Sequence, residues 1–232
     1  HQPSPWMADY GAVVFLPQTA PVKFDGEDRW SGFRPENAVL KPFYKRYELL
    51  RSRSVFELAP TEHCAKMRVE FSGDGDRYFS VLPVEGKYSY EFNAKEDMLY
   101  ITTDNCAGGE HKDFCEYVIL KFEKGAVDPG RTLVNVNADK CKAGTSSSGE
   151  NSAIHLYLNE KKTEISAAVS YISFDMAKTS LEREINEKGF DEIKAEAEDI
   201  WESYLSRIEI TAKNEKQMKT LDFYKKSLVT TE

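Results

Sequence analysis

The first eleven residues hold the side chains best suited to contact a sugar. Pro3 and Pro5 fix the dihedral φ and remove two amide donors, so this segment is predicted to be a stiff loop and neither a helix nor a central strand. The loop holds Trp6 and Asp9 in place, and an indole beside a carboxylate suits the C–H face and the hydroxyls of a sugar. The alternative is that Trp6 fills the core while Asp9 caps a turn of its own loop.

The four cysteines leave three arrangements open. Cys106 and Cys115 flank a glycine-containing stretch that would let their strands meet as a hairpin, so a disulfide is one of them. A metal site of Cys106, His111 and Cys115 is another, although its spacing matches no common zinc pattern and a fourth ligand is missing. We favour the third, in which these two cysteines, Cys64 and Cys141 are free and partly buried thiols.

No acidic couple in the chain identifies itself as catalytic. Inverting glycoside hydrolysis needs two carboxyl groups about 6.5 to 9.5 Å apart around one anomeric carbon, and Asp9 is the one acid in a site-like motif. His63 and His155 fall in strand-like segments, which indicates packing or surface roles. No Ser-His-Asp or Cys-His set has supporting context. We therefore predict no catalytic residue and no metal ligand in this chain.

Short alternating apolar runs, divided by turn residues, extend from residue 11 to residue 173. They predict roughly ten or more strands without intervening helices, which is typical of an antiparallel sandwich. The runs at residues 78–82 and 88–92 flank a Glu-Gly-Lys turn and are predicted to pair as a hairpin. Residues 142–151, rich in serine and glycine, are predicted to be a solvated, mobile loop.

Two further segments place aromatic side chains. Trp30 and Phe33 stand in a charged loop, where we prefer packing over the end of the sandwich to a sugar pocket. After Tyr171 the apolar period becomes helical, and Ser173 is predicted to cap a helix that Gly189 ends in the left-handed conformation.

A second helix follows, and its apolar stripe must cover the sheet or a partner chain, so Trp201 in that stripe is predicted to be structural. Asn214 is predicted to cap a last helix. The predicted fold is therefore mainly β: an antiparallel, supersandwich-like β-sandwich over residues 1–173, followed by two or three C-terminal linker helices within residues 174–232.

Charge and hydropathy exclude two classes of partner. The chain has 31 basic and 39 acidic residues and a formal charge of −8, so it offers no basic stripe to a nucleic acid. No apolar run approaches the roughly eighteen residues that a membrane span requires.

Two motifs resemble glycoside hydrolase family 92, the calcium-dependent exo-α-mannosidases. One is His1-Gln-Pro-Ser-Pro-Trp-x-x-Asp-Tyr-Gly11, followed by an apolar strand and a proline. The other runs from Ser170 to Ile185 and continues through Gly189-Phe-Asp191 to the helix that ends near Ile208. Residues 44–71 are similar to the family only loosely, yet the resemblance spans most of the chain.

The resemblance implies a β-sandwich joined to a helical (α/α)6 barrel that carries the catalytic acid, the base and the calcium ligands. The barrel would begin around residues 214–232, so we expect an N-terminal domain that is inactive alone and holds no cofactor itself. His1, Trp6 and Asp9 are the expected substrate-binding residues. The expected partners are a mannose-containing glycan and the barrel of the same polypeptide, in a secreted, periplasmic or cell-surface enzyme that inverts α-mannosides.

Two other classes of function stay open. One is an autonomous carbohydrate-binding module, in which Trp6, Trp30 and surface tyrosines bind glycan without catalysis. The other is a structural or interaction domain whose helices between Met176 and Leu228 cover a partner.

Overall fold

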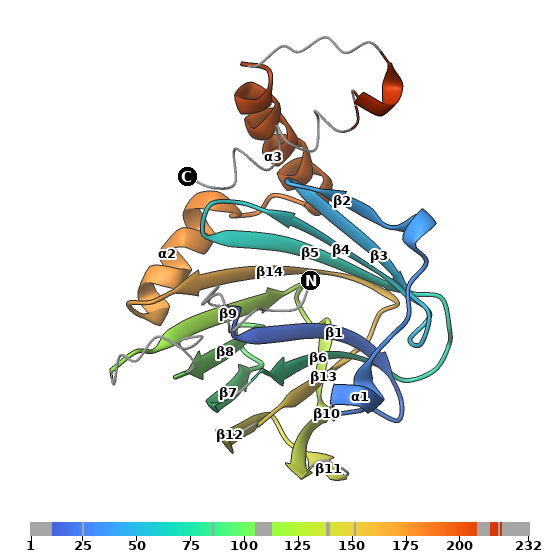
Figure 1. The fold of residues 1–232 in the computed structure, drawn as a ribbon. Helices are drawn as coiled ribbons and strands as arrows, with labels where there is room; N and C mark the ends of the chain where they lie inside the picture. Colours follow the sequence, from blue (N-terminus) through green and yellow to red (C-terminus); the bar gives the residue numbers. More distant parts are fainter. Residues whose placement is uncertain are drawn as a thin grey trace.

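The computed structural model describes residues 11–24, 26–84, 86–104, 113–137, 140–150, 152–207, 214–217 and 219. Over these residues the chain forms two antiparallel β-sheets that stack on each other, with two helices on the outer side of the larger sheet (Figure 1). The predicted fold class, a mainly β sandwich followed by helices, is confirmed.

The smaller sheet has five strands, and each hydrogen-bonded pair is antiparallel. β6 is buried along almost its whole length because both faces of this part of the sheet are covered. In spatial order the strands are β1 (Val13–Thr19), β6 (Arg77–Pro83), β13 (Ile154–Leu158), β10 (Val127–Asn137) and β11 (Lys140–Ala143).

The larger sheet has nine strands and is also antiparallel throughout. Its alternating residues divide between an inner and an outer face, as expected from the two-residue period of a strand. In spatial order the strands are β12 (Ser146–Glu150), β7 (Lys87–Asn93), β8 (Met98–Thr103), β9 (Glu116–Phe122), β14 (Lys162–Ser170), β5 (Cys64–Phe71), β4 (Ser54–Pro60), β3 (Tyr44–Leu49) and β2 (Val39–Lys41).

The main core lies between the two sheets. Met67 and Val69 of β5 and Leu120 of β9 point inward, where they meet Phe79 of β6 and Leu156 of β13. Each of these side chains is fully buried, which stabilises the fold by about 1.5–3 kcal/mol per residue.

The predicted hairpin between residues 78–82 and 88–92 is wrong. β6 pairs with β1 and β13 in the smaller sheet, whereas β7 pairs with β8 and β12 in the larger one. Phe79 and Tyr90 both belong to the core between the sheets, so the two runs bury their apolar sides across the sandwich and not side by side. The turn therefore carries the chain from one sheet to the other.

The predicted mobile loop at residues 142–151 is also wrong, because most of it is strand. Ser146 to Glu150 form β12, which pairs with Glu91 to Lys87 of β7. Backbone hydrogen bonds need no apolar side chain, and β12 is an edge strand with solvent beside it. Small polar residues therefore fit there although their pattern gives no strand signal.

Two long helices follow the sandwich, and shorter ones interrupt its first part. Ser173 caps α2 as predicted, since its hydroxyl accepts the Met176 N–H at 3.2 Å. Gly189 does not end α2: Asn186 takes the left-handed conformation there with φ 48°, and Gly189, with φ −77°, precedes α3. The helices are α1 (Gly26–Arg29), a 3-10 turn (Pro35–Asn37), α2 (Phe174–Glu184) and α3 (Phe190–Leu205).

Both long helices bury one face on the outer side of the larger sheet (Figure 1). Ala177, Leu181 and Ile193 lie against a cluster that includes Cys64 and Ile119 of the sheet. Trp201 packs against the same cluster, so its structural role is confirmed, whereas Ile200 in the same stripe is 58% exposed.

A charged network fixes the start of α3. Arg68 of β5 bonds Glu57 of β4 at 2.7 and 3.1 Å and reaches Asp191 at 2.9 Å. Its guanidinium also lies 4.3 Å from the ring centre of Phe190, which is fully buried. Glu164 of β14 accepts the Phe190 N–H at 2.9 Å, which supplies the cap that Gly189 lacks.

The predicted last helix is described only at its start. Asn214 Oδ1 accepts the Gln217 N–H at 3.0 Å, as a helix cap would. None of the described helices has the length and apolar character that a bilayer span requires.

Candidate functional site

The three predicted substrate contacts, His1, Trp6 and Asp9, lie outside the described residues, as do Cys106 and His111. The remaining three cysteines are free thiols: Cys64 is buried, and Cys115 and Cys141 are half-buried. For these three residues the preferred interpretation is confirmed.

The backbone directly after the predicted sugar motif is fixed to the larger sheet. The Tyr88 hydroxyl of β7 donates to the Ala12 carbonyl at 2.6 Å and accepts the Val84 N–H at 3.1 Å. Ala12 itself is buried. The chain that leaves the motif therefore enters β1 from a defined position at the edge of the sandwich.

A buried acid stands in the same row of the larger sheet as that anchor. Tyr88 pairs with Thr103, and Thr103 pairs with Glu116, so the three residues line up across β7, β8 and β9. Glu116 is buried, its Oε2 has no hydrogen-bond partner among the described residues, and burial raises its pKa to about 7. A carboxyl kept neutral below that pH can donate a hydrogen bond.

Glu116 was not among the predicted site residues, although the sequence contains a signal for it. Glu116 occupies the position that continues the inward-facing series Val118, Leu120 and Phe122, and an acid in such a series is a buried acid.

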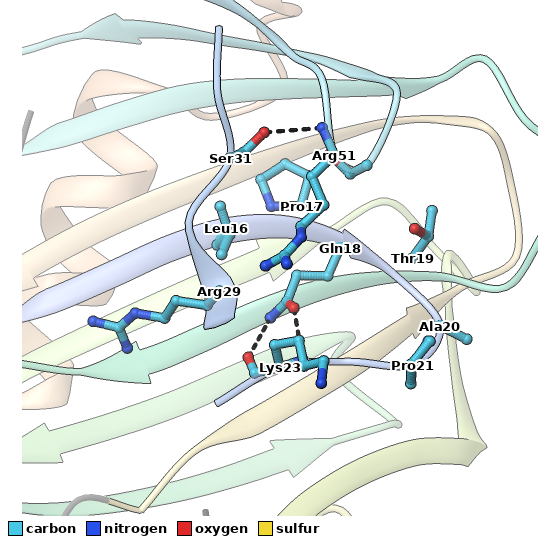
Figure 2. Close-up of a pocket in the computed structure, with 11 residues that line it drawn as sticks. Leu16, Pro17, Gln18, Thr19, Ala20, Pro21, Lys23, Arg29, Ser31 and Arg51 are labelled. Carbon is cyan, nitrogen blue, oxygen red and sulfur yellow. Dashed lines mark hydrogen bonds between the residues drawn. The ribbon is translucent and has the colours of Figure 1, made fainter. Parts of the chain in front are cut away.

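A cavity of about 230 Å³ lies at the other end of β1 (Figure 2). The end of β1, the chain that follows it and the turn between β3 and β4 form its walls. In Figure 2 the Arg51 side chain extends from that turn toward Leu16 and Gln18. The lining residues are Leu16, Pro17, Gln18, Thr19, Ala20, Pro21, Lys23, Arg29, Ser31, Arg51 and Ser52.

Polar side chains connect this cavity to the outer face of the smaller sheet. The Gln18 amide donates to Lys23 O at 3.0 Å and to Ser80 Oγ at 2.9 Å, and its oxygen accepts the Lys23 N–H at 2.8 Å. Ser80 Oγ lies 2.8 Å from His155 Nδ1. Gln18 thus holds the chain after β1 against the sheet.

His155 ends this series of contacts as a neutral imidazole. It is fully buried, and burial lowers its pKa to about 4. Its Nε2 has no partner among the described residues. Ile154 and Leu156 belong to the inner core, so His155 faces outward and is covered by other parts of the chain, in agreement with its predicted packing role.

Glu184 at the end of α2 gathers several donors. Its Oε2 accepts the Thr61 hydroxyl at 2.6 Å and the His63 N–H at 2.9 Å, and its Oε1 lies 2.8 Å from Arg183 and 2.9 Å from His63 Nδ1. Burial alone would raise the pKa of Glu184, but these bonds outweigh it and lower the pKa to about 2. The carboxylate fastens the turn between β4 and β5 to α2.

Glu62, His63 and Glu184 are the one group of metal-type ligands that the described part of the chain brings together, within 4.8 Å. Calcium prefers six to eight oxygen ligands, whereas this group offers one imidazole and two carboxylates, and the Glu184 carboxylate is already bonded to the Arg183 guanidinium. The group does not suit calcium, and its contacts are those of a structural clamp.

The packing interpretation of Trp30 is wrong. Trp30 is 62% exposed, and α1, which it follows directly, has no buried residue to draw it inward. Phe33 contacts Tyr47 edge-on at 5.5 Å between ring centres and is 44% exposed. Trp30 stands between two cavity-lining residues, Arg29 and Ser31.

The chain matches two domains of one known family. Residues 1–180 match the glycosyl hydrolase family 92 N-terminal domain, and residues 176–228 match the glycosyl hydrolase family 92 catalytic domain. These matches define a glycoside hydrolase chain that includes the N-terminal domain. The chain belongs to glycosyl hydrolase family 92, as the motifs predicted.

Solved structures of the family share this fold. The inverting mannosidase BT2199 from Bacteroides thetaiotaomicron VPI-5482 superposes with a TM-score of 0.81 at 23% identity over 92% of this chain. The family enzyme ccman5 gives 0.72 at 15% identity, and the α-mannosidase BT3965 from Bacteroides thetaiotaomicron gives 0.69 at 16%, each over 87% of this chain.

The chain spans 29% of the length of each of these structures. The comparison with curated proteins found no match.

Proposed function

We propose that this chain is the N-terminal domain of an α-mannosidase that hydrolyses α-mannosides of glycans with inversion. The observation that carries the proposal is the match of residues 1–180 to the family's N-terminal domain. The likeness to a structure described as an inverting mannosidase supports it.

In this proposal the sandwich supplies one wall of the sugar site. Trp6 offers its ring to the apolar face of the mannose, and Asp9 and His1 offer polar contacts. The acid that protonates the leaving oxygen and the base that activates water are assigned to the helical barrel, because the sequence identifies no such couple in this chain. The Tyr88 anchor at Ala12 supports the exit of the motif.

Two further expectations of the resemblance belong to the same proposal. A calcium ion is assigned to the barrel, since the clamp at Glu62, His63 and Glu184 does not suit it. Export to the periplasm, the cell surface or the medium is proposed on the resemblance alone.

The test compares residues 1–232 with a chain that is extended through the barrel, using an aryl α-mannoside. We expect no turnover by residues 1–232 and turnover by the extended enzyme, with the β-anomer of mannose appearing first in the NMR spectrum. In the extended enzyme, Trp6→Ala should reduce kcat/KM at least tenfold, while the exposed control Leu40→Ala should not. Hydrolysis by residues 1–232 alone, or equal activity of Trp6→Ala and the unmodified enzyme, would contradict the proposal.

A second candidate is a carbohydrate-binding module. The exposure of Trp30 beside a cavity favours it, because a solvated indole is a ready platform for a sugar ring. Quenching of tryptophan fluorescence by a saccharide, lost in Trp30→Ala, would support this function independently of turnover.

A further inference from the structure

The cavity at the end of β1 is unusual in its charges. Three of its lining side chains, Lys23, Arg29 and Arg51, are cationic, and none is acidic. Lys23 Nζ lies 3.7 Å from Asp28, so part of its charge is answered locally. The Arg51 guanidinium has no acidic partner among the described residues. A guanidinium carries five N–H donors and no acceptor. A suitable partner for Arg51 is therefore an oxyanion.

The surroundings of Arg51 strengthen such a contact. Its side chain extends over β1 toward Leu16 and Gln18 (Figure 2), and Pro17 and Ala20 add to the apolar wall. Arg51 is itself exposed, so solvent still screens its charge, but the apolar wall lowers the local dielectric constant on one side of it. The two oxygens of a carboxylate, or of a sulfate or phosphate, match the guanidinium fork with two parallel hydrogen bonds.

The site is fixed before any ligand enters. The backbone N–H of Arg51 donates to Ser31 Oγ at 3.1 Å. This bond joins the turn between β3 and β4 to the chain beyond α1 (Figure 2). The buried hydroxyls of Ser52 and Ser54 lie 2.7 Å apart and hold the same turn. On the opposite wall, Gln18 makes three hydrogen bonds. Preformed walls reduce the ordering cost of binding.

The size of the cavity limits what enters it. Its volume of about 230 Å³ is below the range of about 300 to 1,000 Å³ that is typical for drug-sized ligands. One charged substituent or one small ring is therefore suitable. Trp30 is exposed and follows Arg29 and precedes Ser31 in the chain, and both of these neighbours line the cavity.

We infer that this cavity binds the oxyanion of an acidic saccharide, which Arg51 pairs with two hydrogen bonds while Trp30 stacks on the sugar ring. The saccharide part of this inference rests on the proposed function, whereas the pairing of an oxyanion with Arg51 does not. The chemistry is shared by the carboxylate of a uronate and by sulfate or phosphate esters of sugars.

The test is titration calorimetry of residues 1–232 with three probes: methyl β-glucuronide, methyl α-mannoside and inorganic phosphate. We expect the glucuronide to bind with a Kd on the order of 1 mM, and at least tenfold more tightly than the uncharged mannoside. Arg51→Gln should weaken glucuronide binding at least tenfold, and Trp30→Ala about threefold or more. Arg53→Gln is the matched control, because it removes the same charge from an exposed position in the same turn that does not line the cavity.

Two results would overturn the inference. The inferred oxyanion site is contradicted if the unmodified chain, Arg51→Gln and Arg53→Gln bind the glucuronide equally. It is also contradicted if none of them binds it. If phosphate binds as tightly as the glucuronide and Trp30→Ala has no effect, the saccharide part of the inference is wrong and the cavity is a site for free anions. Neither result depends on mannoside turnover, so each is distinguishable from a failure of the proposed function.

Discussion

On the outer face of the nine-stranded sheet Glu184 engages four donor groups, whereas on the outer face of the five-stranded sheet one ring nitrogen of His155 has no partner within the described part of the chain. The first face is covered by two helices with a shared apolar cluster, and the second is covered near β1 by chain that leaves a cavity. In the first region the protein stabilises charges by pairing them. In the second it suppresses one charge by burial and leaves another, on Arg51, exposed to solvent.

The helix-covered region therefore fixes the fold, and the region near the cavity is available for binding. The charges of Glu184 and Arg68 are already paired with groups of the chain itself, so these residues serve the joint between sandwich and helices. Groups with unused donors, such as Arg51, retain the capacity for a further ligand.

Phe190→Ala should have the largest effect, because it empties the fully buried position under α3 and removes the ring on which Arg68 lies. We expect a loss of about 3–5 kcal/mol in the free energy of unfolding, measured by urea denaturation. The same substitution at the largely exposed Phe33 should cost about 1 kcal/mol or less. Equal losses at the two positions would show that the helix joint does not contribute more than the surface.

Glu184→Gln should cost about 2–3 kcal/mol at pH 7, since it weakens several charge-assisted hydrogen bonds at once. The pKa of Glu184 is lowered to about 2, so its contribution is complete above the ordinary carboxyl range and is lost as the pH falls toward 2. The difference in unfolding free energy between the variant and the unmodified chain should therefore shrink to about half at pH 3. Glu182→Gln, at an exposed site on the same helix, should show neither effect.

The burial of His155 should make the free energy of unfolding sensitive to mild acid. Its pKa is lowered to about 4, so between pH 6.5 and pH 4 the unfolded chain takes up a proton that the folded chain does not, and stability falls with pH. Between pH 7 and pH 4.5 this group should account for about 2 kcal/mol of the loss. His155→Asn, which keeps a polar atom near Ser80, should lose correspondingly less over that interval. An identical pH profile for both proteins would place the acid sensitivity elsewhere.

Arg51→Gln should change stability least, by less than about 0.5 kcal/mol, because the side chain is exposed and pairs with no acid among the described residues. Coincident urea curves for this variant and the unmodified chain would show that Arg51 is not needed for folding. A loss above about 1 kcal/mol would instead show that Arg51 stabilises the fold, and the two outer faces would then not differ in this respect.

Local patterns in the sequence predicted much of the fold. Alternation identified most of the strands between Tyr44 and Ser170, although not β11 and β12, and the hydroxyl at Ser173 marked the start of α2 because a cap is a local interaction. The pairing of strands was less accessible. Residues 78–92 have the pattern of a hairpin, yet Phe79 and Tyr90 are both buried in the core between the two sheets, which is a tertiary effect.

The candidate sites depend even more on distant contacts. The cavity is lined by residues around Gln18 and by Arg51. No local sequence pattern predicts that the turn after β3 lies next to the end of β1. Glu184 meets Thr61 across 123 positions of sequence. Likewise, Asn186 and not Gly189 ends α2, because Gly189 is used at the start of the next helix.

The serine-rich strand β12 has a consequence for the behaviour of the chain in solution. As the last strand of the nine-stranded sheet it presents open backbone groups, but Ser146, Ser148 and Glu150 give an incoming strand no apolar surface to bury. The opposite border, β2, is only three residues long. Both borders therefore discourage the strand-by-strand growth that leads to amyloid, and concentrated samples should resist fibril formation from these edges.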